Sequence, residues 1–113
     1  MSDFSMIDTQ ALAELLAQRE ALQLVDVRNP DEVARGMIEG ARHIPLGLLP
    51  QRFEELGRDR PVVFYCQSGV RSMQASAFLA SRGWSRVSNL TGGVMAWVRS
   101  GLPLKAPDHQ QAE

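Results

Sequence analysis

The chemistry that stands out in this sequence centres on its one cysteine, Cys66. It directly follows the β-favouring run 61–65, which has no polar face and is typical of a strand buried on both sides. A helical pattern begins about six residues later, near Ser72. Ligands of open α/β sheets bind at the carboxyl ends of strands, where the strand order reverses. The sequence therefore predicts that Cys66 lies at a ligand-binding edge.

The residues after Cys66 have the composition of an anion-binding loop. Gly69 allows backbone conformations that other residues resist, so several main-chain N–H groups can point at the sulfur. The helix N-terminus adds partial positive charge and Arg71 a full one, and both favour thiolate over thiol. We expect a nucleophile near neutral pH. The predicted cradle consists of Gln67, Ser68, Gly69, Val70 and Arg71.

Each of these residues also has a purely structural interpretation. Cysteine is among the most buried residue types and is usually inert in a core, so Cys66 could be a packed thiol at a strand end. Arg71 could cap the helix or form a surface ion pair. A lone cysteine allows neither an intrachain disulfide nor a cysteine-based metal site, and we expect no metal and no organic cofactor.

The elements before the cysteine alternate between strand and helix patterns. A short strand is predicted over 4–7, followed by a helix that Asp8 caps. The next strand covers 22–27. A second helix should begin at Pro30, because Asn29 can cap it and Glu32 can complete a capping box.

The remainder of the chain continues the alternation. An extended piece is predicted over 40–45, helical structure over 46–56, and helices over 72–82 and 94–100 around a strand at 86–90. In the helix 72–82, the residues expected to pack are Met73, Ala77, Phe78 and Ala80. The pattern predicts an α/β fold with an open, mainly parallel five-stranded sheet and helices on both faces. We expect one domain over 4–104 and a flexible tail over 105–113.

Composition limits the classes of partner. The 113 residues have a net charge of −1, so the basic excess typical of nucleic-acid binders is missing. The apolar runs are too short for a membrane span or a signal peptide. We therefore expect a cytoplasmic protein that binds neither nucleic acid nor membranes.

Four motifs in order resemble the rhodanese family of sulfurtransferases, in its short single-domain bacterial type. The motifs are Asp26-Val27-Arg28, the stretch 38–45, the loop 66–72, and Leu90-Thr91-Gly92-Gly93 with the residues up to Trp97. The match extends from about Met6 to Leu104. One departure is Met37, which stands where the family often has histidine and puts local hydrogen bonding in question.

The resemblance implies a role for each matching residue. Cys66 would take a sulfane sulfur from thiosulfate or a persulfide donor and pass it to a thiophilic acceptor such as cyanide or a thiol. The loop 67–71 would bind substrate and stabilise the persulfide, and Asp26 and Arg28 would shape the neighbouring strand end. From the residues alone, Asp26 should pair with backbone or an arginine, and Arg28 should be a surface charge. Because there is no second cysteine, the acceptor must come from outside, as a small molecule or a protein.

Two other functions remain open from the sequence. Phosphatases and arsenate reductases of similar fold also surround a cysteine with an arginine loop, but they have five residues between the two, whereas four separate Cys66 from Arg71. The tighter loop favours a sulfur atom over a tetrahedral phosphate. The second alternative is a non-enzymatic persulfide carrier or partner-binding module.

Overall fold

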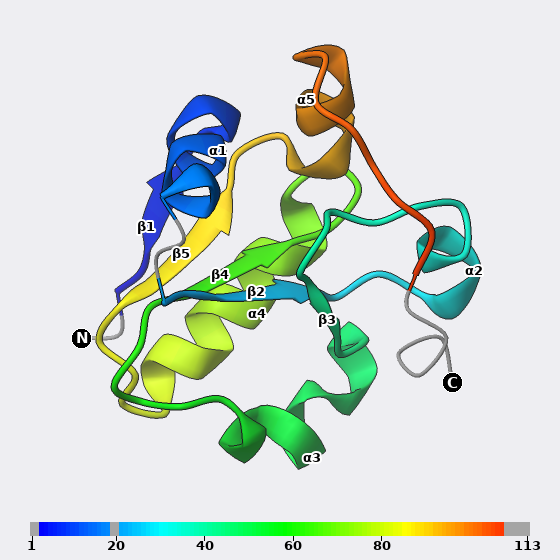
Figure 1. Ribbon diagram of the computed structural model, residues 1–113. Helices are drawn as coiled ribbons and strands as arrows, with labels where there is room; N and C mark the ends of the chain where they lie inside the picture. The colour runs from blue at the N-terminus through cyan, green and yellow to red at the C-terminus, as the bar shows by residue number, and fades with distance from the viewer. Residues whose placement is uncertain (1–2, 19–20, 108–113) are drawn as a thin grey trace.

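The computed structural model describes residues 3–18 and 21–107 and has a five-stranded, fully parallel sheet at its centre (Figure 1). Across the sheet the strand order is β1-β5-β4-β2-β3. The strands are β1 (Ser5–Ile7), β2 (Gln23–Asp26), β3 (Arg42–His43), β4 (Val62–Tyr65) and β5 (Val87–Leu90). The α/β class, the parallel sheet and the central place of the run 61–65 are thereby confirmed.

Helices cover both faces of this sheet (Figure 1). They are α1 (Thr9–Ala17), α2 (Pro30–Val33), α3 (Leu49–Arg52), α4 (Val70–Ser81) and α5 (Gly93–Arg99). Short 3-10 turns, Leu46–Leu48 and Phe53–Glu55, flank α3. Helices α3 and α4 lie on one face, and α1, α2 and α5 lie on the other.

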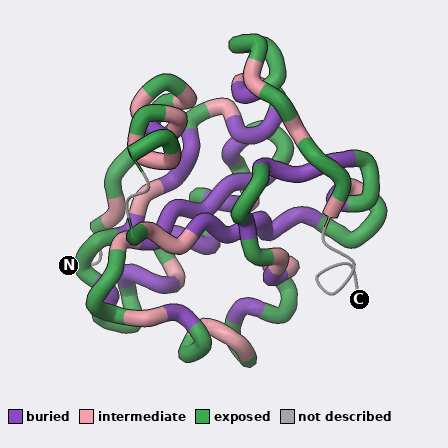
Figure 2. The backbone as a smooth tube through the Cα atoms, in the orientation of Figure 1, coloured by how far each residue is buried: buried purple, intermediate pink, exposed green. Residues whose placement is uncertain are grey.

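The central strand separates two hydrophobic cores. All four residues of β4 are buried (Figure 2). Successive side chains of a strand point to opposite faces of the sheet. Val62 and Phe64 pack with α3 and α4, whereas Val63 and Tyr65 pack with α1, α2 and α5. This arrangement explains why the run has no polar face.

Both predicted helix caps are present. The N–H of Ala11 donates to Asp8 Oδ1 at 2.8 Å, and the N–H of Asn29 donates to Glu32 Oε1 at 2.9 Å. A cap of this kind contributes about 1 kcal/mol. Helix α2 begins at Pro30, as predicted, so these local signals determine where the chain turns into each helix.

The prediction for α4 needs two corrections. The helix begins at Val70 rather than Ser72, because the loop after Cys66 is shorter than the pattern indicated. Met73, expected to pack, is 44% exposed, and Ala77 is also exposed. Small side chains allow the helix to approach the sheet closely, so its buried face is formed by Ser72, Ala75, Ser76, Leu79 and Ala80.

The segment after α5 returns across the molecule. The main chains of Met37 and Lys105 exchange two hydrogen bonds of 2.9 Å as an isolated antiparallel bridge. Lys105, the first residue of the predicted flexible tail, is therefore paired, while 108–113 lie outside the described residues. Both bonds use the main chain of Met37, so they do not depend on which side chain stands at this position.

No helix in the described part of the chain is both long and apolar enough to span a membrane. Within 3–18 and 21–107, no three His, Cys, Asp or Glu side chains are grouped so that they could hold a metal ion.

The sheet has its topological switch point between β2 and β4. From β2 the chain passes through α2 to the edge strand β3, and from β4 it passes through α4 to β5 on the other side. The two connections therefore diverge on opposite faces and leave a crevice at the carboxyl ends of the strands. Cys66 follows β4 directly at this crevice, as predicted.

Candidate active site

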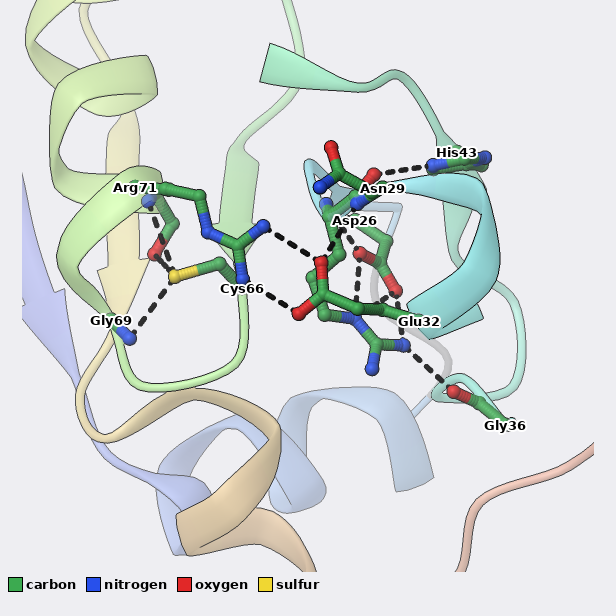
Figure 3. A network of polar contacts seen from close by, with 10 residues as sticks. Asp26, Asn29, Glu32, Gly36, His43, Cys66, Gly69 and Arg71 are labelled. Atoms are coloured by element: carbon green, nitrogen blue, oxygen red, sulfur yellow. Dashed lines mark hydrogen bonds and ion pairs between the residues drawn. The ribbon is translucent and has the colours of Figure 1, made fainter. Parts of the chain in front are cut away.

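The sulfur of Cys66 lies inside the loop that joins β4 to α4 (Figure 3). The residue is 1% exposed, and Sγ accepts hydrogen bonds from the N–H of Gly69 at 3.1 Å and from the N–H and Oγ of Ser72, both at 3.4 Å. Burial raises the pKa of the thiol. The hydrogen bonds from Ser72, Gly69 and Ser68 outweigh burial, so the pKa of Cys66 is lowered overall. The site favours a thiolate, which an inert core thiol does not require.

The five predicted cradle residues do different things. Gly69 adopts a left-handed conformation with φ 105° and directs its N–H at the sulfur. Ser68 adds a backbone hydrogen bond that lowers the pKa of Cys66. Gln67 and Val70 are exposed, and among the described residues neither donates a hydrogen bond to the sulfur. In this structure, Gln67 and Val70 contribute only to the course of the main chain around the sulfur.

Arg71 contacts a carboxylate rather than the sulfur. Its Nη1 and Nη2 donate to Oε1 and Oε2 of Glu32 at 2.7 and 2.8 Å, in a bidentate pair that connects α4 to α2 (Figure 3). The hydrogen bond from Arg71 is the largest cause that lowers the pKa of Glu32 to about 2. Arg71 is the arginine that the sequence analysis expected to bind an anion. Its charge is already neutralised by Glu32, which the sequence analysis treated only as a helix-capping residue.

Ser72 is a second residue whose role the sequence analysis missed. It stood at the end of the quoted loop motif and was assigned to the helix. Its hydroxyl nevertheless donates to Cys66 Sγ, and its side chain is fully buried. The sequence did offer one signal for this role, the spacing of six residues between Ser72 and Cys66. With a short loop, that spacing places the first turn of the helix next to the sulfur.

Asn89 supports the loop from the neighbouring strand β5. This side chain is fully buried, and its Nδ2 donates to the carbonyl oxygen of Gly69 at 3.2 Å. Its Oδ1 has no hydrogen-bond partner among the described residues. The bond holds the carbonyl group of Gly69, the residue whose N–H faces Cys66. No sequence pattern indicated this contact, since the two residues meet only when β4 and β5 pair.

The turn at Gly92 and Gly93 presses the start of α5 against the cysteine loop. The N–H of Val94 donates to the carbonyl oxygen of Cys66 at 2.8 Å, and the N–H of Met95 donates to the carbonyl oxygen of Gln67 at 3.1 Å. Gly93 has φ 60°, and a Cβ there would overlap both carbonyl groups. The turn is therefore a backbone support of the loop as well as a helix entry.

Asp26 and Arg28 form a buried ion pair under α2. Asp26 is 0% exposed and Arg28 is 3% exposed, which corrects the expectation that Arg28 is a surface charge. Arg28 Nη2 donates to Asp26 Oδ2 at 2.8 Å and to the Gly36 carbonyl oxygen at 2.7 Å. A buried arginine needs these partners. The pair connects the end of β2 to Gly36, which follows the C-terminal end of α2.

A pocket of about 430 Å³ adjoins the loop at Gln67. Helices α2 and α5 form its two sides, with Glu32 at one wall and Val94 at another. The lining does not include Cys66 itself, but Glu32 belongs both to the pocket wall and to the ion pair with Arg71.

Comparisons with known proteins agree with this geometry. The family described as Rhodanese-like domain matches residues 8–100. A protein named Sulfurtransferase from Allochromatium vinosum is 50% identical over 102 residues, which cover 90% of this chain and 95% of that protein. A protein named Thiosulfate sulfurtransferase GlpE from Vibrio cholerae is 32% identical over 106 residues, 94% of this chain and 99% of that one. The crystal structure of a rhodanese-related protein from Thermoplasma volcanium has a TM-score of 0.83 and 29% identity, and covers 90% of this chain and 98% of that one.

Proposed function

Because this chain belongs to the rhodanese-like domain family, we propose that it is a sulfurtransferase that carries sulfane sulfur as a persulfide on Cys66. The observation that carries the proposal is the set of donors around the sulfur. The N–H groups of Gly69 and Ser72 and the Ser72 hydroxyl converge on Sγ, and the pKa of the thiol is lowered by them. A stabilised thiolate in a loop of donors is a nucleophile with a site prepared for anionic sulfur.

The proposed reaction is a double displacement. Cys66 Sγ attacks the outer sulfur of thiosulfate, a new S–S bond forms, and the old S–S bond breaks as sulfite leaves with the electron pair. The acceptor then attacks the outer sulfur of the persulfide. With cyanide, a C–S bond forms, thiocyanate leaves and the Cys66 thiolate returns. The loop N–H groups stabilise the anionic sulfur at both stages.

Arg71 is proposed to contact the anionic donor. The hydrogen bond to Glu32 is the largest cause that raises the pKa of Arg71, and attraction to the Cys66 thiolate is a smaller one. In this state Glu32 holds the guanidinium, and a donor such as thiosulfate competes with that carboxylate for it. Gln67 and Val70 would complete the donor loop around the transferred sulfur.

Partners and location follow from this chemistry as proposals. The donor is thiosulfate or a persulfide, small or protein-borne, and the acceptor is an external thiophile because Cys66 is the chain's one cysteine. The reversible S–S bond is itself the sulfur carrier, so the proposed steps use no additional cofactor. We propose a cytoplasmic location, because thiols such as Cys66 are kept reduced there.

The loop also argues against phosphate chemistry. Four residues separate Cys66 from Arg71. The N–H groups of Gly69, in the loop, and of Ser72, in the first turn of α4, lie 3.1 and 3.4 Å from Sγ. A ring of this size fits one additional sulfur more readily than three phosphate oxygens.

Mass spectrometry after incubation with thiosulfate tests the proposal. Wild type should gain the mass of one sulfur atom on the peptide containing Cys66, and the gain should disappear with thiocyanate formation when cyanide is added. Cys66→Ser, which keeps a side chain of similar size, is the matched control. Equal thiocyanate formation by the two proteins would overturn the assignment of Cys66.

A further inference from the structure

Strand β5 has a polar residue on a face of the sheet that is otherwise apolar. In the pairing of β4 with β5, Asn89 lies opposite Phe64, and Val87 precedes it by two positions on the same face. Phe64 and Val87 belong to the hydrophobic core that α3 and α4 cover. Asn89 is 0% exposed, so an apolar, β-favouring residue would be the ordinary choice at this position.

The amide of Asn89 is only half satisfied. Its Nδ2 donates to the carbonyl oxygen of Gly69 at 3.2 Å and lies 3.8 Å from Met6 Sδ, but its Oδ1 accepts no hydrogen bond from the described residues. A buried acceptor without a partner lowers the stability of the folded state. Stability alone therefore does not account for the residue, and the bond to Gly69 is the feature that needs a reason.

Gly69 is a residue whose conformation depends on its contacts. It has φ 105° and ψ −7°, and glycine can leave this region for others at little cost. Its N–H donates to Cys66 Sγ at 3.1 Å (Figure 3), and its carbonyl oxygen also accepts the N–H of Met73 at 3.2 Å. The N–H and the carbonyl group belong to two peptide units that meet at the Gly69 Cα. Holding one of them restricts the directions that the other can take.

The two bonds to the Gly69 carbonyl oxygen come from different parts of the fold. Met73 belongs to α4, so its bond moves with that helix. Asn89 belongs to β5, which pairs with β4, the strand that leads directly into Cys66. Through Asn89, the sulfur and one of its donors are therefore referred to the same pair of strands.

We propose that Asn89 is a positioning residue of the sulfur-transfer reaction, which through Gly69 keeps a main-chain N–H directed at the sulfur of Cys66. It holds this donor in place for the thiolate that attacks and for the thiolate that is restored when the sulfur leaves. The inference rests on the proposed function, because it gives Asn89 a part in that reaction. The half-satisfied amide then has a reason, since functional sites are where a fold gives up local stability.

Titration of the Cys66 thiol in Asn89→Val tests the proposal without any sulfur substrate. Valine suits a strand and removes the amide. The bond from Gly69 is one of the causes that lower the pKa of Cys66, so a displaced N–H should raise this pKa. The acid dissociation constant of the thiol should fall roughly threefold to tenfold, measured from the ultraviolet absorbance of the thiolate against pH.

Val87→Ala is the matched control. It removes two methyl groups from the same strand, face and core, two positions before the residue that bonds Gly69, and so it loosens β5 without removing that bond. Its thiol should titrate as in wild type. Asn89→Ala, which adds no bulk, is titrated beside Asn89→Val and should show the same change. Urea unfolding checks that each variant is folded over the pH range used.

The pH profile of thiosulfate turnover extends the test to the reaction itself. At pH 7, turnover by Asn89→Val should fall in proportion to the thiolate fraction, and it should recover towards the wild-type rate as the pH is raised above the new pKa. A merely structural role would lower turnover equally at every pH. Wild-type turnover at pH 7, or a loss that does not recover, would overturn the positioning role.

The remaining outcomes separate this inference from the proposed function. An unchanged titration in a folded Asn89 variant, or an equal change in Val87→Ala, would overturn the inference and leave the sulfurtransferase assignment standing. If neither Asn89 variant folds, the residue is required for the fold rather than for one donor, and the inference is overturned as well. If thiosulfate loads no persulfide on wild type, the proposed function fails, whereas a raised pKa in Asn89→Val alone would still support the positioning of the donor.

Discussion

The Arg71–Glu32 ion pair connects the first turn after the Cys66 loop to α2. The substitution Glu32→Gln should remove most of the strength of this ion pair while keeping the shape of the side chain. The amide can still accept a hydrogen bond from Arg71 but carries no charge. We expect the variant to fold, to be less stable than wild type at pH 7, and to lose the stability contributed by the pair.

The magnitude follows from the pKa of Glu32. The hydrogen bond from Arg71 is the largest cause that lowers this pKa from an ordinary 4.5 to about 2. A difference of about 2.5 corresponds to roughly 3.4 kcal/mol at 1.36 kcal/mol per pKa unit. The side chains of Arg71 and Glu32 are 32% and 18% exposed, so solvent screens the pair. We therefore expect a loss of about 1–2 kcal/mol.

The pH dependence has a definite sign. The folded pKa of Glu32 is depressed by Arg71, so its carboxylate contributes stability above the unfolded value near 4.5. That contribution is lost as the pH falls through about 2. The stability difference between wild type and Glu32→Gln should thus be constant above about pH 5.5 and should shrink between pH 4.5 and 2.

Urea unfolding at a series of pH values measures this difference. A double-mutant cycle with Arg71→Gln isolates the pair, and its coupling energy should account for most of the loss. A difference that stays the same at pH 3 and pH 7, or a cycle with no coupling, would refute the electrostatic explanation. The same variant frees Arg71, so its KM for thiosulfate should fall; an unchanged KM would mean that Glu32 does not compete with the donor.

Three further changes test the loop itself. Ser72→Ala removes a donor to Cys66 Sγ and should raise the pKa of the thiol, which ultraviolet titration of the thiolate would detect; an unchanged titration would exclude the hydroxyl from thiolate stabilisation. Gly93→Ala places a Cβ against the carbonyl oxygen of Cys66 and should cost about 2 kcal/mol or more in urea unfolding, whereas wild-type stability would show that the turn is not tight. Inserting one residue between Ser68 and Gly69 should abolish most thiosulfate turnover while the circular dichroism spectrum is retained, and equal turnover would show that loop size does not select sulfur over phosphate chemistry.

Local sequence signals were sufficient for the order of the elements and for the place of Cys66. The buried run 61–65 has no polar face because both sides of the central strand are covered, and a cysteine at its end must lie at the carboxyl edge of a parallel sheet. Asp8 and Asn29 begin helices through contacts with residues three positions away. Interactions of such short range are determined by neighbours in the chain, and the sequence shows those neighbours directly.

Contacts between distant segments were decided by the tertiary structure alone. Glu32 meets Arg71 because β2 and β4 pair side by side and send α2 and α4 to the same crevice. Asn89 reaches the Gly69 peptide because β5 pairs with β4 on the other side. Arg28 is buried beside Asp26, with its guanidinium also bonded to the Gly36 carbonyl oxygen beyond α2. The sequence by itself predicted that Cys66 is the candidate nucleophile and that it stands at a strand end. Which charges and donors surround it depended on strand order, since side chains dozens of residues apart become neighbours only when the sheet assembles.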